Sequence, residues 1–345
     1  MASKTPARPI ATTSPSPPDN AERSRAQQTR YVDEITATAQ QLLAEDASVG
    51  DLKIAAGALR EIAHAFKVFA PYRQVRKVST FGSARTQPGD PVFVLAESFA
   101  RAIADAGYMV ITGAGPGIME ACQRGAGRDR SFGINIQLPF EQSANEVILG
   151  DPKLMVFRYF FARKLFFLKE ADAVVLFPGG FGTHDEGFET LTLLQTGKTR
   201  PVPLLLLDRR GGTYWKTWQR YVEDHLLRRG MISSEDLALY KVTDNVETAV
   251  AEITTYYSVY HSSRFVHDRF VMRLTRPLSD TALQDLAREF RDIIKDGVLE
   301  QRTAFSAERA ETEIYHLPRL VFHFDRIHYG RLRMMIDRIN QTPEP

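Results

Sequence analysis

The chain has 345 residues, of which 43% are hydrophobic and 25% charged, as in a globular protein with one large domain or two modest ones. Its formal net charge of +2 is too small for a nucleic-acid coat or a polybasic membrane anchor. No apolar run approaches the roughly 18 residues that span a bilayer. Together with the small net charge, this means that neither a nucleic-acid polymer nor a membrane is expected as a partner.

The first segment and the cysteine content both bear on localisation. MASKTPARPIATTSPSPPDN is rich in Pro, Ser and Thr and lacks the apolar core of a secretory signal. We therefore predict a disordered tail over residues 1–29. Cys122 is the only cysteine, which excludes a disulfide framework and fits a reducing cytoplasm. No flanking pattern marks it as a nucleophile, so we interpret it as a small buried residue.

Residues 30–72 show helical periodicity and no strand, which predicts a helical N-terminal extension. Leu59, Ile62 and Phe66 recur at spacings of three and four. Pro71 should end this helix, because proline cannot donate the N–H that continues the ladder.

Over residues 73–262 apolar strands alternate with helices, which indicates a doubly wound, Rossmann-like parallel sheet of the α/β class. Such sheets bind ligands at the carboxyl ends of their strands. A small C-terminal α/β unit is predicted over 263–345, with a helix opened by Asp280. It carries no glycine loop and no acid cluster, so we assign it to packing or assembly. The expected strands lie in VRKVSTFGSA, YMVITGAG, SFGINIQLP, ADAVVLFPGG, PVPLLLLD, RFVMRLTRPLS and PRLVFHFDR. The segment VFRYFFARKLFFLKEA is expected to combine a short strand with a helix.

Three of the strands end in glycine loops able to admit a ligand: FGSAR (81–85), TGAGPGIME (112–120) and PGGFGTHDE (178–186). Glycine leaves backbone N–H groups accessible to an anion, and a following helix N-terminus adds positive potential. The second loop has G-x-G-x-G spacing rather than the dinucleotide fingerprint, and no P-loop is present. A mononucleotide or sugar phosphate suits the pattern better.

The triplet His184, Asp185 and Glu186 ends the third loop. Thr183 and Glu186 form a T-x-x-E pattern that predicts a capping box, which requires no function. Adjacent helical residues point in different directions, so no metal site is expected. A capping acid and a functional acid are not exclusive.

At these residues the chain resembles the LONELY GUY (LOG) phosphoribohydrolases, historically labelled lysine decarboxylase-like. PGGFGTHDE matches the PGGxGTxxE motif, and ARK at 162–164 matches the Arg-Lys pair of the upstream motif. The resemblance covers roughly 75–257, and the extensions at both ends indicate a longer subgroup. Phe160 departs from the family, whose upstream motif usually begins with Met.

The resemblance implies hydrolysis of the N-glycosidic bond of a nucleoside 5′-monophosphate, AMP or an N6-substituted AMP, without a cofactor, by a homodimer or higher homo-oligomer. Glu186 would stabilise the charge that develops at C1′ and orient water, with Arg163 holding the carboxylate or the phosphate. The phosphate would be bound by Gly179, Gly180, Gly182, Thr183 and Ser83. The nucleoside would be bound by Gly82, Gly113, Gly115, Gly117, Glu120 and Lys164.

Other interpretations remain open. Arg163 and Lys164 also suit the solvated face of an amphipathic helix, Ser83 a plain turn, and Glu120 a cap of its own helix. A nucleotide-binding sensor without turnover is the alternative function. A pyridoxal-dependent lysine decarboxylase would need a Schiff-base lysine, for which Lys164 is the only nominee.

Overall fold

The computed structural model describes residues 20–137, 143–309 and 311–344. The described parts of Met1–Leu52 and Ala304–His316 form one compact unit, and those of Lys53–Thr303 and Leu317–Pro345 form another. Helix α1 (Asn20–Ala44) belongs to the first unit. Residues 20–29 are therefore helical, and the predicted tail is wrong there; residues 1–19 lie outside the described residues. The prolines end before Asn20, and the Ala, Gln and Arg residues that follow favour a helix.

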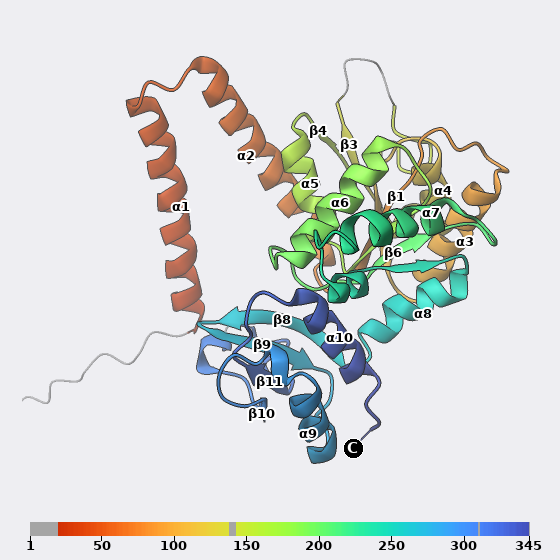
Figure 1. Ribbon diagram of the computed structural model, residues 1–345. Coiled ribbons are helices and arrows are strands. Elements are labelled where there is room, and N and C mark those ends of the chain that lie inside the picture. The colour runs from red at the N-terminus through yellow and green to blue at the C-terminus, as the bar shows by residue number, and fades with distance from the viewer. Residues whose placement is uncertain (1–19, 138–142, 310, 345) are drawn as a thin grey trace, which may run out of the picture. The chain divides into compact units, whose positions relative to one another are not determined.

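The second unit contains a seven-stranded sheet in which all neighbouring strands are parallel (Figure 1). The strand order is β4-β3-β2-β1-β5-β6-β7. The chain builds outward from β1 to β4 and then returns to place β5 beside β1, so the topological switch point lies between β1 and β5. The strands are β1 (Lys77–Phe81), β2 (Met109–Thr112), β3 (Ser131–Ile136), β4 (Leu154–Phe157), β5 (Ala173–Leu176), β6 (Leu204–Leu207) and β7 (Lys241–Thr243).

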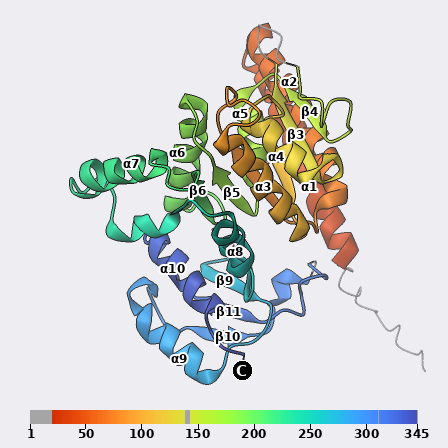
Figure 2. The ribbon, with the colours of Figure 1, turned by 90° about the vertical axis from the view of Figure 1, so that its right-hand side faces the viewer.

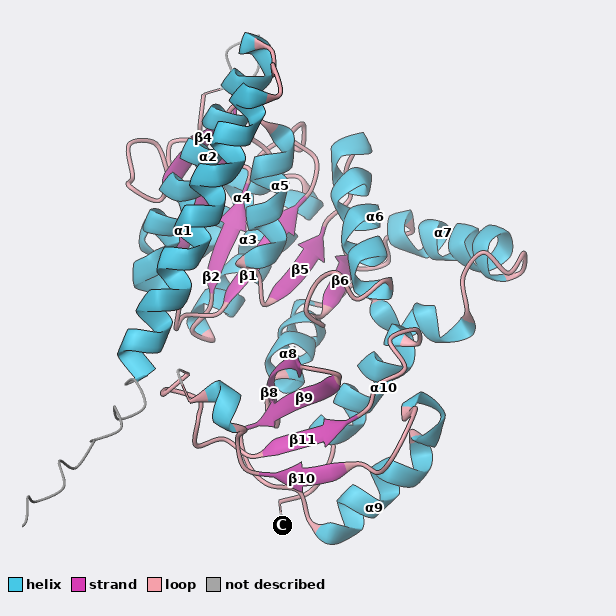
Figure 3. Cartoon of the chain, turned by 90° about the vertical axis from the view of Figure 1, so that its left-hand side faces the viewer, coloured by secondary structure: helices cyan, strands magenta, loops and turns pink. Residues whose placement is uncertain are grey.

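Helices cover both faces of this sheet (Figures 2 and 3). Successive strand residues point to opposite faces, so in β5 Val174 joins the core under α5 and Val175 the core under α3, α4 and α8. This is the predicted doubly wound α/β class, which is confirmed. The helices that alternate with the strands are α3 (Pro91–Asp105), α4 (Ile118–Ala126), α5 (Phe160–Lys169), α6 (Phe181–Gln195), α7 (Tyr214–Tyr221) and α8 (Val246–Tyr256).

Helix α2 (Val49–Phe69) ends where the proline predicts. A 3-10 turn, Ala70–Tyr72, contains Pro71 and leads toward β1. Phe69 is buried at the end of α2 and stacks on Phe132 of β3 with ring centroids 4.5 Å apart. The last part of the helical extension is thus fixed to the sheet by aromatic packing.

The C-terminal part of the second unit is a four-stranded antiparallel sheet with α9 and α10 (Figure 2). Its order is β10-β11-β9-β8. β8 begins at Tyr260, slightly before the predicted boundary at 262/263. Strands β7, β8 and β10 were not foreseen, and the domain limits otherwise remain predictions. The elements are β8 (Tyr260–Val266), β9 (Arg269–Leu274), α9 (Asp280–Glu289), β10 (Glu300–Arg302), β11 (Arg319–Phe322) and α10 (Tyr329–Asn340).

Candidate functional site

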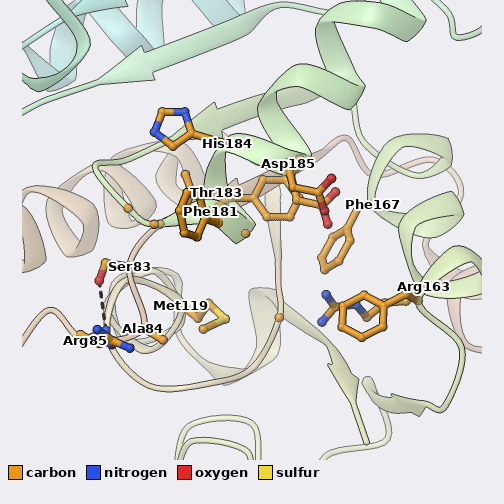
Figure 4. A pocket seen from close by; sticks show the side chains of 18 residues that line it. Ser83, Ala84, Arg85, Met119, Arg163, Phe167, Phe181, Thr183, His184 and Asp185 are labelled. Atoms are coloured by element: carbon orange, nitrogen blue, oxygen red, sulfur yellow. Dashed lines mark hydrogen bonds between the residues drawn. The ribbon is translucent and has the colours of Figure 1, made fainter. Parts of the chain in front are cut away.

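A cavity of about 800 Å³ lies at the switch point of the parallel sheet (Figure 4). The loops after β1, β2 and β5 line it, together with residues of α4, α5 and α6. Strands β1 and β5 are paired in register along their length, which brings their carboxyl ends to the same point. The cavity therefore occupies the place where open α/β sheets bind ligands.

The glycine loops are joined by backbone hydrogen bonds. The Ser83 N–H donates to the Pro178 carbonyl oxygen at 3.1 Å, and the Ile118 N–H donates to the Ser83 carbonyl oxygen at 3.0 Å. At Gly117, φ is +70° and a Cβ would lie 2.4 Å from that same carbonyl oxygen. Gly117 thus permits the close approach of two loops.

Helix α6 begins at Phe181, with Gly180 as its N-cap and no capping side chain. Thr183 is consequently inside the first turn and Glu186 in the second, so the predicted capping box is wrong. The physical reason is that the chain turns into the helix at the glycine loop, two residues before Thr183. Glu186 is 6% exposed and does not cap the helix, which leaves its carboxylate for other interactions.

Glu186 belongs to a cluster of three carboxylates around one lysine. Lys164 Nζ lies 3.2 Å from Glu186 Oε1, 2.8 Å from Asp185 Oδ2 and 2.6 Å from Glu189 Oε2. Burial raises the pKa of Glu186 above its ordinary value, and the charge of Lys164 opposes this rise. Burial lowers the pKa of Lys164, but the hydrogen bonds to Asp185 and Glu189 more than compensate, so its pKa is raised overall.

Arg163 points into the cavity beside the ring of Phe167 (Figure 4). Its guanidinium carbon lies 5.4 Å from the centre of that ring and 5.0 Å from the ring of Phe160. The buried Nε has no hydrogen-bond partner among the described residues. Burial lowers the pKa of Arg163, while the charges of Glu186 and Asp185 raise it. A cation with unused donors in a cavity is suited to an anionic ligand.

Most of the residues predicted from the sequence line this one cavity. Those that do are Gly82, Ser83, Gly113, Arg163, Gly179, Gly180, Gly182, Thr183 and Glu186.

Four candidates lie outside the cavity lining. Glu120 pairs with Arg124 at 2.5 Å, and Lys164 contacts the Glu186 carboxylate at 3.2 Å. Gly117 serves loop packing, and the Gly115 carbonyl oxygen accepts a hydrogen bond from Asn145 Nδ2 at 2.9 Å.

Sequence reasoning missed several cavity residues. Arg85 directly follows FGSA and lines the cavity, so its position in the loop was an available signal. Phe181 is 95% exposed at the cavity, where its place between two motif glycines indicates access to a ligand. Met119 and Phe81 also line the cavity, but nothing in the sequence distinguishes them from residues of the hydrophobic core. The aromatic run is divided, since Phe157, Phe166 and Phe167 are buried whereas Phe160 and Phe161 are exposed.

Cys122 is fully buried, and burial raises the pKa of its thiol to about 12, so it is no nucleophile. Within the described residues, no group of three or more His, Cys, Asp or Glu side chains is arranged to hold a metal ion. None of the described helices combines the length and hydropathy needed to cross a bilayer.

Comparison with known proteins gives one family match. Residues 118–253 match the family described as "Possible lysine decarboxylase", a span that includes Arg163, Lys164 and the whole PGGFGTHDE motif. It confirms the resemblance found from those residues. No curated protein of similar sequence was found.

The solved structures that match are distant. A molybdenum cofactor carrier protein from Chlamydomonas reinhardtii is 19% identical, over 52% of this chain and 96% of its own, with a TM-score of 0.37. The molybdenum cofactor binding protein of Rippkaea orientalis is 18% identical, over 52% and 95%, with a TM-score of 0.36. DNA processing protein A from Helicobacter pylori is 18% identical, over 53% and 83%, with a TM-score of 0.37. At such TM-scores these likenesses carry no argument about ligands or activity.

Proposed function

Over residues 118–253 the chain carries a domain of the possible lysine decarboxylase family, and from this premise we propose that it is a nucleoside 5′-monophosphate phosphoribohydrolase. The reaction would hydrolyse the N-glycosidic bond of AMP or an N6-substituted AMP to free base and ribose 5-phosphate. One observation carries the proposal. The buried carboxylate of Glu186 and the incompletely bonded guanidinium of Arg163 line the same cavity as the glycine loops.

In this reaction the C1′–N bond breaks, and its electron pair leaves with the base. Positive charge develops at C1′ and the ring oxygen, and the Glu186 carboxylate would stabilise it. The same carboxylate would orient the water whose oxygen attacks C1′ and accept its proton, which finally resides on the base. Lys164 would keep Glu186 ionised in spite of its burial.

The 5′-phosphate would be held by the loop after β5 and the start of α6. Gly180 and Gly182 line the cavity, and a Cβ at either would meet nothing within 4 Å. The missing side chains leave room for an anion close to the backbone, at the positive end of the helix dipole. Ser83, Thr183 and Arg163 would complete this site. We also propose a cytoplasmic homodimer or higher homo-oligomer, for which the exposed Phe160 and Phe161 are available.

The activity that the family description suggests fits the residues less well. Pyridoxal chemistry needs a lysine amine that can lose its proton and face the cofactor. Among the described residues that line the cavity there is no lysine. Lys164 is held among three carboxylates, and its pKa is raised. We therefore derive no step through pyridoxal phosphate.

The test is to incubate the protein with a panel of nucleoside 5′-monophosphates, including AMP and N6-isopentenyl-AMP, and to separate the products by chromatography. Release of free base is expected. Glu186→Gln removes the charge but not the volume and should lower kcat by at least about 1000-fold. The matched control is Glu97→Gln on α3, where an exposed pair with Arg101 is lost and activity should be unchanged.

Two other results would contradict parts of this proposal. If the nucleotides remain intact while AMP still binds, the hydrolase is excluded and the chain is a nucleotide sensor. If Glu186→Gln retains full activity, the hydrolase stands but another residue performs the chemistry.

A further inference from the structure

The first residue of α7 is tied to the glycine loop after β5. The Tyr214 hydroxyl donates a hydrogen bond to the Gly179 carbonyl oxygen, across a separation of 35 residues. The Tyr214 N–H in turn donates to Asp208 Oδ2 at 2.9 Å. Asp208 is only 4% exposed at the end of β6, so the start of α7 is anchored to the sheet. A rigid element thus determines where the Gly179 carbonyl group points.

The orientation of this carbonyl group has a consequence for the next N–H group. The Gly179–Gly180 peptide bond is trans, so the Gly179 C=O and the Gly180 N–H point in opposite directions. With the carbonyl group held toward Tyr214, the Gly180 N–H points away from it. Gly180 lines the cavity and Tyr214 does not. Among the described residues, the Gly180 N–H has no hydrogen-bond acceptor.

His184 stabilises the hydroxyl that makes this contact. Its Nε2 lies 2.7 Å from the Tyr214 hydroxyl oxygen. A tyrosine hydroxyl has one hydrogen, which Gly179 already accepts, so Nε2 must be the donor in the second bond. Burial lowers the pKa of His184, which favours the neutral ring; the hydrogen bond to Tyr214 then places its hydrogen on Nε2. The ring also packs against Tyr214 and Trp215, with centroid distances of 5.9 Å and 5.7 Å.

We propose that Tyr214, supported by His184, is a positioning residue that directs the Gly180 N–H at the phosphate group of the ligand. This inference rests on the proposed function in one respect only, namely that the ligand is a phosphate monoester. Tyr214 would not touch the substrate; it would act through the peptide group that does. The hydrogen bond to a charged acceptor would then be preorganised rather than formed by rearrangement on binding.

Calorimetric titration with AMP and with adenosine tests this role, because only AMP carries the phosphate. Tyr214→Phe removes the hydroxyl and keeps the ring. It should weaken AMP binding by about tenfold and leave adenosine binding within about twofold of the wild type. His184→Phe should weaken AMP binding less, by about threefold, since the Tyr214 hydroxyl remains. Tyr221→Phe is the matched control on the same helix, where Tyr221 is 50% exposed, and should change neither.

In steady-state assays Tyr214→Phe should raise KM for AMP far more than it lowers kcat. The proposal is overturned if AMP binding is unchanged in Tyr214→Phe, or if AMP and adenosine binding weaken equally, which would indicate a general structural role. A third result is that the wild type binds AMP more tightly than Tyr214→Phe does and yet releases no base. That result would overturn the hydrolase and leave the positioning role intact.

Discussion

The seven-stranded sheet carries buried charge both where its strands begin and where they end. We call the first the amino-end edge and the second the carboxyl-end edge, and the charges at the two have different partners. At the amino-end edge, Asp172 accepts a hydrogen bond from the Lys77 N–H at 2.9 Å. Its Oδ1 also lies 3.2 Å from Arg76 Nη1 and 3.4 Å from Arg200 Nη2. The Arg76 guanidinium lies 3.5 Å from the ring centre of Tyr257. This carboxylate is surrounded by partners that the chain itself supplies.

At the carboxyl-end edge the pairing is incomplete. Glu186 shares one lysine with two other carboxylates, and the buried Nε of Arg163 has no partner among the described residues. Buried polar groups normally find partners, because leaving one without a hydrogen bond costs about 1–3 kcal/mol. The comparison teaches that satisfied charge at one edge stabilises the fold, whereas unsatisfied charge at the other edge is available to a ligand.

Replacing the unsatisfied cation should separate activity from stability most clearly. Arg163→Met should lower kcat/KM for AMP by about 100- to 1000-fold, because a preorganised charge at the proposed reaction site is lost. The free energy of unfolding, measured with urea, should stay the same or rise, since a partly desolvated charge is removed. Arg101→Met, an exposed arginine on α3, is the control and should alter neither quantity. A clear loss of stability in Arg163→Met would contradict the comparison.

The opposite result is expected at the amino-end edge. Asp172→Asn leaves Arg76 and Arg200 without their carboxylate and should lower the free energy of unfolding by about 2 kcal/mol. The kcat/KM of the folded protein should stay within about twofold of the wild type. Asp105→Asn, at the exposed end of α3, controls for the substitution itself. Unchanged stability in Asp172→Asn would show that the ion pairs of Asp172 do not stabilise the fold.

The location of the candidate site was predictable from local sequence. Apolar runs that end in glycine specify parallel strands and their loops, and the carboxyl ends of β1 and β5 meet because the strands are parallel. Arg163 and Glu186 were identified through their motifs, which can be recognised in the sequence without knowledge of the fold. The structure brings both to the cavity with the loops.

The partners of these residues were not predictable in the same way. The T-x-x-E pattern of Thr183 and Glu186 is a local signal, but the start of α6 is fixed by the glycine loop that precedes it. The bond from Lys164 to Glu189 spans 25 residues and depends on how α5 packs against α6. Tyr214 lies farther still from Gly179, and no motif marks it. Contacts of this kind arise from tertiary packing, which local periodicity does not encode.

The smallest expected effect concerns Lys164, the lysine that partly neutralises the carboxylates at the carboxyl-end edge. Burial raises the pKa of Glu186, and Lys164 opposes this rise, so Lys164→Met should raise that pKa further. The proposed reaction would need the ionised carboxylate, which is lost as pH falls through the pKa. The acidic limb of the kcat/KM profile should therefore move to higher pH, while activity on the alkaline side stays near that of the wild type. Lys169→Met, an exposed lysine on the same helix, should leave the limb in place. A uniform loss of activity at every pH in Lys164→Met would instead favour direct contact between Lys164 and the nucleotide.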